Sequence, residues 1–322
     1  INEVYPTYYP PRKTPKECYE QIIADLTDAE QYAPDNDNSD RTKMTKTVAQ
    51  AMLAKVYAEK EVQDYDKVIA YADKVMKTTG VELEDSYETL WGYDETAKDC
   101  MKRNTKEGIL EVHWTTGSGN WETWMYGRQL DNWDYYFTWA KWITPSRDII
   151  NDFDKEGDEV RKNQAVVYYA CTWSNYYPAS NYPFMYKLRS SYNNIYWVRL
   201  ADIILMKAEA EAYKGNLAES AKLVNQIRKR AKLKELTSDK TGSKESMIEA
   251  VLHERRLELA FEGERWFDLC RNNKVEKYLN GIDNRDSGRI RQVRQFDSNS
   301  YLLPIPQTAL DQNTNLEQNP GY

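Results

Sequence analysis

The chain has 322 residues, and its 44 Lys and Arg against 51 Asp and Glu give a net charge of −7. Charged residues make up 30% of the chain and hydrophobic residues 41%, a composition typical of a globular protein and not of a disordered one. The negative balance excludes nucleic acid as the main partner, because phosphate binding needs a surplus of cations.

Histidines and cysteines are too few and too scattered for a metal centre or a redox motif. The only histidines are His113 and His253, and Leu257 stands where a helical zinc-binding pair would place its second histidine. No two of the four cysteines form a CxxC pair; they are Cys18, Cys100, Cys171 and Cys270. We therefore predict four buried thiols and no cofactor.

The first helix is predicted to begin at Thr14-Pro15, because Thr is a capping residue and Pro fits a first helical turn. Apolar residues then recur along one face at Tyr19, Ile22, Leu26, Ala29 and Ala33. Pro34 and the polar run 35–40 end this helix.

Two helix pairs follow the same pattern. The apolar faces of the first pair are Ala49, Met52, Leu53 and Val56, then Tyr65, Val68, Ile69, Ala72 and Val75. Gly80 is expected to end the first pair, and Gly215-Asn216 to form the turn of the second. The apolar faces of the second pair are Ala201, Leu205, Ala208 and Ala212, then Leu217, Ala221, Val224, Ile227 and Ala231. Small residues where two helices meet are typical of tetratricopeptide units, although the spacing fits that consensus only loosely.

Residues 81–198 have a different character and contain nine of the ten tryptophans. Helical periodicity is weak there and turns are frequent, so we expect no long helix; residues 109–114 are predicted to form a short strand. We interpret this stretch as a loop-rich elaboration on the helical frame, where binding residues tend to lie.

Residues 245–271 form a third helical block, which Gly263 is expected to interrupt. Glutamates and arginines alternate along it at helical spacing, a pattern typical of an exposed helix with surface salt bridges. The alternating residues are Glu254, Arg255, Arg256, Glu258, Glu262 and Arg265.

Three motifs between residues 198 and 322 match one known family. Residues 198–210 (Val-Arg-Leu-Ala-Asp-Ile-Ile-Leu-Met-Lys-Ala-Glu-Ala) contain an Arg-Leu-Ala-Asp-x-x-Leu-x-x-Ala-Glu-Ala helix, and residues 254–269 contain a Glu-Arg-x-x-Glu-Leu-x-Phe-Glu-Gly block. Pro304-Ile305-Pro306 and the closing Gln318-Asn319-Pro320-Gly321-Tyr322 complete the set. In this order and spacing, the chain from about Thr14 onward resembles the SusD/RagB-like family.

The resemblance implies a mainly all-α fold in which tetratricopeptide-like helix pairs support a loop-rich irregular domain. It also implies that the charged residues of 254–265 form buried or half-buried ion pairs, whereas the alternation of their charges alone indicates an exposed helix. We divide the chain into a helical part (1–80), an aromatic-rich binding elaboration (81–198) and a helical C-terminal part with the family motifs (199–322).

By the same resemblance, the protein captures a glycan at the cell surface of a Bacteroidetes outer membrane for import through a SusC-like TonB-dependent transporter. Membrane attachment would use only an N-terminal lipid anchor, which this sequence does not contain. No catalytic motif stands out, and a protein with 51 acidic residues always offers some carboxylate pair, so we do not expect an enzyme. The alternative is a tetratricopeptide scaffold or a RagB-type protein that binds peptide or protein cargo.

The predicted ligand contacts lie in the tryptophan-rich run, because sugar rings stack on aromatic planes and nearby polar groups orient their hydroxyls. The candidates are Trp121, Trp124, Tyr126, Trp133, Tyr135 and Tyr136. For any single one of them, packing of the insertion onto the helices stays an open alternative. A second, weaker candidate is the run of residues 173–177.

Overall fold

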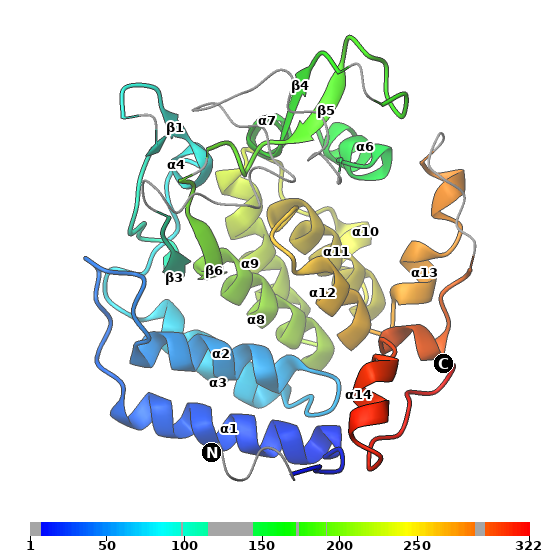
Figure 1. The fold of residues 1–322 in the computed structure, drawn as a ribbon. Coiled ribbons are helices and arrows are strands. Elements are labelled where there is room, and N and C mark those ends of the chain that lie inside the picture. The colour runs from blue at the N-terminus through cyan, green and yellow to red at the C-terminus, as the bar shows by residue number, and fades with distance from the viewer. Residues whose placement is uncertain (1–7, 98, 115–143, 172–173, 191, 287–293) are drawn as a thin grey trace.

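Helices dominate the computed structural model, which describes residues 8–97, 99–114, 144–171, 174–190, 192–286 and 294–322 (Figure 1). The mainly α-helical fold predicted from the sequence is therefore confirmed. Among the described residues, no helix is both long enough and apolar enough to cross a membrane.

Helix α1 (Pro15–Tyr32) forms an outer layer of the fold (Figure 1). The Thr14 hydroxyl accepts a hydrogen bond from the Glu17 N–H at 3.2 Å, and the Glu17 carboxylate accepts one from the Thr14 N–H at 2.9 Å. This capping box fixes the predicted start of the helix. No residue of α1 is fully buried, although the helix packs against α2 (Lys46–Ala58).

Helices α2 and α3 (Tyr65–Met76) form the first predicted pair. Helix α3 ends at Met76, so the prediction that Gly80 ends it was wrong. Gly80 has a φ of +79°, and a Cβ atom there would lie 2.1 Å from the Asn38 side chain. Glycine is therefore required at this position by the close approach of Asn38 and by the left-handed backbone.

Helices α8 (Leu200–Lys214) and α9 (Leu217–Arg230) form the second predicted pair, and α11 (Lys244–Glu258) packs against both. Gly215 ends α8 in the left-handed conformation at φ +84°, as predicted.

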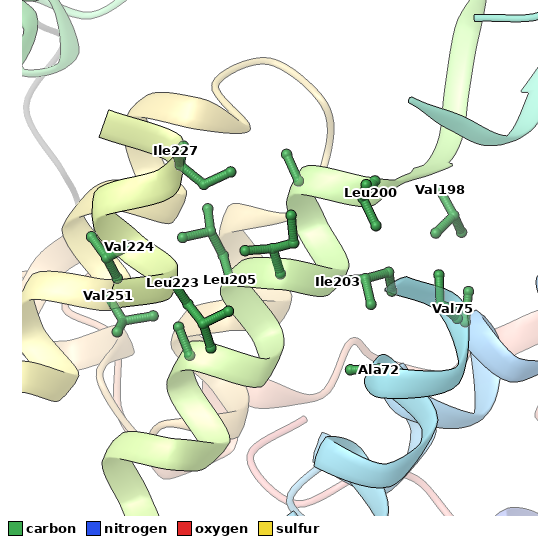
Figure 2. Packing of buried hydrophobic residues seen from close by; sticks show 14 of the residues in the cluster. Ala72, Val75, Val198, Leu200, Ile203, Leu205, Leu223, Val224, Ile227 and Val251 are labelled. Atoms are coloured by element: carbon green, nitrogen blue, oxygen red, sulfur yellow. The ribbon is translucent and has the colours of Figure 1, made fainter. Parts of the chain in front are cut away.

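One hydrophobic core joins these helices (Figure 2). Ala72 and Val75 of α3 lie on one side of Ile203 of α8, while Val224 of α9 and Val251 of α11 close the other side. All five side chains are completely buried. Residues before 80 and after 198 therefore share a core, and the three-part division of the chain stays a prediction.

Along the chain, short helices and strands lie between the two helix pairs. They are α4 (Glu88–Trp91), β1 (Tyr93–Asp94), β2 (Asp99–Cys100), β3 (Gly108–Val112), α6 (Arg147–Glu156), α7 (Glu159–Ala165), β4 (Val166–Tyr169), β5 (Tyr182–Met185) and β6 (Ile195–Arg199). Strand β3 confirms the strand predicted at residues 109–114. It pairs antiparallel with β6, as β1 does with β2 and β4 with β5.

The remaining elements follow α9 along the chain. They are α10 (Ser238–Thr241), α12 (Arg265–Arg271), α13 (Val275–Leu279), η2 (Ile282–Asn284), η3 (Ser298–Tyr301) and α14 (Gln307–Gln312). Gly263, with a φ of +86°, lies in the break between α11 and α12, where the interruption was predicted.

The charged block at residues 254–265 is buried or half-buried, so the exposed helix inferred from alternating charges was wrong. Glu254, Arg255 and Glu258 are completely inaccessible to solvent, which confirms the buried ion pairs implied by the family resemblance. Their partners come from distant segments: the Glu258 carboxylate accepts hydrogen bonds from Arg199 at 2.6 Å, from Arg161 at 3.2 Å and from Arg230. Burial alone would raise the pKa of Glu258, but these three guanidinium groups hold it well below its usual range.

A second buried cluster ties α8, α11 and α12 together. Arg255 donates to Asp202 at 2.7 Å and to Asp268 at 2.9 Å, and Arg271 donates to Glu209 at 2.6 Å. Each charge is thus met by an opposite one, the condition under which charged groups are tolerated in an interior.

All four cysteines are free thiols, but the prediction that all are buried was wrong. Cys100 and Cys171 are buried, whereas Cys270 is half-buried and Cys18 is exposed. Cys18 lies on α1 in the outer layer, where none of the elements that the structure describes covers it.

Candidate binding surface

The six predicted contact residues, Trp121, Trp124, Tyr126, Trp133, Tyr135 and Tyr136, lie outside the described residues, as does the rest of segment 115–143. The structure does describe the residues on either side of this segment and the surfaces that they contact.

On its N-terminal side, Trp114 is held by the guanidinium group of Arg103. This group donates to the backbone oxygen of Trp114 at 2.9 Å and to that of Tyr192 at 3.0 Å, and it pairs with the Asp99 carboxylate at 2.9 Å. The start of the tryptophan-rich segment is therefore held against the strand region near β2 and β6.

On the C-terminal side of the segment, Pro145 contacts Tyr177 of the second candidate run. The Tyr177 hydroxyl donates to the Pro145 carbonyl at 2.8 Å, and the Thr144 hydroxyl donates to the Pro183 carbonyl at 2.8 Å. The chain that carries the predicted contacts thus returns to the frame beside Tyr177.

Tyr176, Tyr177 and Arg147 together form a surface that we call the aromatic shelf. The two phenol rings meet edge to face, with centroids 4.9 Å apart and planes at 83°. The guanidinium carbon of Arg147 lies 4.4 Å from the centroid of the Tyr176 ring and 4.1 Å from that of Tyr177. Such cation–π contacts hold all three groups in one arrangement.

Asp286 contacts two residues of the shelf and fixes their positions. Its carboxylate, which is completely buried, accepts a hydrogen bond from the Tyr176 hydroxyl at 2.5 Å and pairs with Arg147 at 3.3 Å. Arg147 also donates to the Tyr176 backbone oxygen. The positive charge of the shelf is therefore neutralised within the protein.

Local structure explains why these residues meet. Arg147 is the first residue of α6, which begins where the Ser146 hydroxyl accepts from the Ile149 N–H at 3.3 Å. Helix α6 is held by Phe153, which packs into a cluster with Leu257 of α11. The shelf is therefore mounted on the helical frame, with Tyr176 and Tyr177 in the connection between β4 and β5 (Figure 1).

A cavity of about 890 Å³ opens over the shelf. Its lining residues are Arg147, Ser174, Asn175, Tyr176, Tyr177, Pro178 and Ala179. Asn175 is exposed, and its amide has no hydrogen-bond partner among the described residues. Burial raises the pKa of Tyr177, and the neighbouring Tyr176 adds to that rise, so its hydroxyl stays protonated and can donate.

This arrangement suits the binding of a flat, partly apolar ring with polar substituents. Ring faces offer stacking, and the Asn175 amide and Ser174 hydroxyl offer hydrogen bonds. Glycoside hydrolysis needs two carboxylates across the scissile bond. Among the described residues, no carboxylate lines this cavity, and Asp286 behind it is already engaged.

Sequence reasoning identified Tyr176 and Tyr177 as the weaker candidate but missed Arg147 and Asp286. Arg147 had a local signal, because it follows a capping serine at the start of a helix. Asp286 had none, since only the fold brings it to the shelf from far along the chain.

Comparison with known proteins gives a consistent result. A model of the SusD family matches residues 36–322. The chain is 28% identical to SusD-like protein P2 of Formosa agariphila over 96% of its own length, and it spans about two thirds (66%) of the length of that relative.

Two solved structures share the fold. One is a SusD superfamily protein from Bacteroides vulgatus, with a TM-score of 0.76 at 22% identity over 98% of this chain and 70% of that one. The other is a laminarin-binding SusD-like protein, with a TM-score of 0.73 at 23% identity over 96% of this chain and 70% of that one. The family motifs contribute to the buried ion-pair clusters of the helical frame. The chain belongs to the SusD family.

Proposed function

We propose that this protein binds an oligo- or polysaccharide at the cell surface and delivers it, without chemical change, to a SusC-like TonB-dependent transporter in the outer membrane. The observation that carries the proposal is the aromatic shelf, together with the return of the chain to Tyr177 at Pro145, directly after the tryptophan-rich segment. Membership of the SusD family and the likeness to a laminarin-binding protein support the choice of a glycan.

Binding would proceed by stacking and hydrogen bonding alone. A sugar ring lies against Tyr177. The hydroxyl groups of the sugar exchange their hydrogen bonds to water for hydrogen bonds to the Asn175 amide and the Ser174 hydroxyl. Because Arg147 is neutralised by Asp286, the shelf carries no surplus charge and accepts an uncharged ring. The tryptophans at 121, 124 and 133 and the tyrosines at 126, 135 and 136 would extend the contact along a longer chain.

A calorimetric titration tests this proposal directly. The panel consists of laminarihexaose, maltohexaose, cellohexaose and mannohexaose, with a pool of mixed peptides as the competing class of cargo. We expect heat from at least one glycan and about a tenfold loss of affinity in Tyr177→Ala, because one stacked aromatic contributes up to about 1.4 kcal/mol. Tyr32→Ala, which removes a tyrosine that is 76% exposed on α1, is the matched control.

Two results would overturn the proposal. Heat from peptides and from no glycan would favour the alternative of peptide or protein cargo. Equal glycan affinity in Tyr177→Ala and in Tyr32→Ala would remove the aromatic shelf from the binding site.

A further inference from the structure

A second cavity, of about 560 Å³, lies far from the aromatic shelf, where the first helices meet the C-terminal part of the chain. It is lined from α1, from the turn after α2, and from α12, α13 and η3. The lining residues are Tyr19, Glu59, Lys60, Glu61, Cys270, Arg271, Asn273, Glu276, Ser298 and Tyr301. Its volume is within the range of small-molecule sites.

Two phenol rings from distant parts of the chain form its aromatic walls. Tyr19 comes from α1 and Tyr301 from η3, and both rings are half-buried. The Tyr301 hydroxyl donates to the Glu276 carboxylate at 2.7 Å, which fixes the orientation of its ring. The cavity therefore has one oriented ring, that of Tyr301, and a second ring, that of Tyr19, of the kind on which sugar rings stack.

Polar groups of three kinds face the same space with their bonding capacity unused. Within the described residues, the Glu59 carboxylate, the Asn273 amide and the Ser298 hydroxyl make no side-chain hydrogen bond and no ion pair. Asn273 is held in the left-handed region at φ +51°, a conformation that costs of order 1 kcal/mol outside glycine, although asparagine tolerates it best. Burial raises the pKa of Glu59 and outweighs the charges of Arg271 and Lys55, which lower it, because neither cation forms an ion pair with this carboxylate.

Charge decides which sugars the cavity admits. The cavity is lined by Glu59, Glu61 and Glu276 and by Lys60. The Lys60 ammonium group lies 5.6 Å from the centroid of the Tyr301 ring. Arg271 adds no free charge, because its guanidinium group is already paired with Glu209 at 2.6 Å and with Asp268 at 2.7 Å. The excess of carboxylates repels sulfate and uronate groups, while it supplies acceptors for the hydroxyl groups of a neutral ring.

We infer that this cavity is a second saccharide-binding site, which takes a neutral pyranose ring between Tyr19 and Tyr301 and excludes anionic sugars. The inference rests on the proposed function, since it assigns the same class of ligand to a separate place on the molecule. A glycan chain could then be held at two points, which raises its effective affinity without any new contact at the shelf.

The experiment uses the whole chain and separates the two sites by mutation. Tyr177→Ala combined with Trp121→Ala and Trp124→Ala disables the first site, and Tyr301→Ala is then added to this background. The probes are the four neutral hexasaccharides named above and hexagalacturonate, measured by calorimetry. Tyr301→Phe keeps the ring but loses the bond to Glu276, Tyr32→Ala is the control, and thermal melting checks that each variant is folded.

We expect the triple variant to retain binding of a neutral sugar, Tyr301→Ala to lower that residual affinity about tenfold, and Tyr301→Phe to preserve most of it. Hexagalacturonate should not bind the triple variant. If the triple variant loses all glycan binding while the wild type binds, the second site is overturned and the proposed function stands. If the wild type binds no sugar of the panel, the proposed function and the second site are both overturned. If the triple variant binds a sugar and Tyr301→Ala does not change that affinity, the second site alone is overturned.

Discussion

Arg199 and Glu258 are bonded at 2.6 Å in the interior of the protein, with both side chains at most 1% exposed. Arg199 belongs to the family motif at residues 198–210, and Glu258 to the motif at residues 254–269. The second buried cluster joins the same two motifs, because Arg255 pairs with Asp202. The signatures that identify the family therefore maintain its frame, and they support the proposed binding surfaces from inside the protein.

Replacing Glu258 by Gln should destabilise the protein strongly. The substitution keeps the shape of the side chain but leaves Arg161, Arg199 and Arg230 with one anion fewer in a buried site. Loss of one partner of a buried pair costs about 3–5 kcal/mol. Urea unfolding followed by circular dichroism measures this change in the free energy of unfolding.

The exposed pair of Lys222 and Glu219 on α9 provides the control. Glu219→Gln should change the free energy of unfolding by less than about 1 kcal/mol, because surface ion pairs contribute little. Similar unfolding midpoints for the two variants would show that the buried cluster does not stabilise the frame.

The sequence predicted the helix pairs well because their determinants are local. The spaced alanines lie within the helices that they predict, and Gly215 directly follows the helix that it ends. The same holds for the capping Thr14, whose partner Glu17 is in the first turn.

Burial of the charged block could not be read from its own pattern. Alternating charges look alike on a wet surface and in a paired interior, and the difference lies in Arg161, Arg199 and Arg230, which come from other segments. The same limit applies to Asp286 at the aromatic shelf and to the cavity between Tyr19 and Tyr301. Each depends on segments that only the fold brings together.

Acid should weaken the protein partly through Glu156. A hydrogen bond from His253 and the charge of Arg228 outweigh burial and lower the pKa of Glu156 from 4.5 to about 2. Because the folded pKa is depressed, the stabilisation is complete above about pH 4.5 and is lost as the pH falls through 2. The Glu156 side chain is 26% exposed, so we expect this contribution to be about 2 kcal/mol.

Comparison of wild type with Glu156→Gln isolates this effect from the other carboxylates. The difference in their free energies of unfolding should be largest near pH 7 and shrink between pH 4.5 and 2.5, as urea midpoints would show. A difference that stays constant over this range would contradict the assignment.

The four thiols should react with Ellman's reagent in separate phases. Cys18 is exposed and should be modified first, while Cys270 is half-buried and burial raises its pKa to about 11. Cys100 is buried with a pKa raised to about 12, and Cys171 is also buried, so both should react only after unfolding. Cys18→Ser should abolish the fast phase, and a fast phase that survives this substitution would contradict the exposed position of Cys18 on α1.

Tryptophans of the frame and of the predicted binding segment should respond to mutation in opposite ways. Trp91 is 2% exposed and meets Tyr196 edge to face at 5.1 Å, so Trp91→Ala should cost about 3–5 kcal/mol of stability. Trp121→Ala and Trp124→Ala should instead weaken glycan binding about tenfold each and leave the melting temperature within a few degrees of wild type. Calorimetry and thermal melting on the same three variants measure both quantities. If Trp121→Ala and Trp124→Ala destabilise the protein as much as Trp91→Ala while binding per folded molecule is unchanged, these two rings pack the segment onto the frame, and the glycan is held by the aromatic shelf without them.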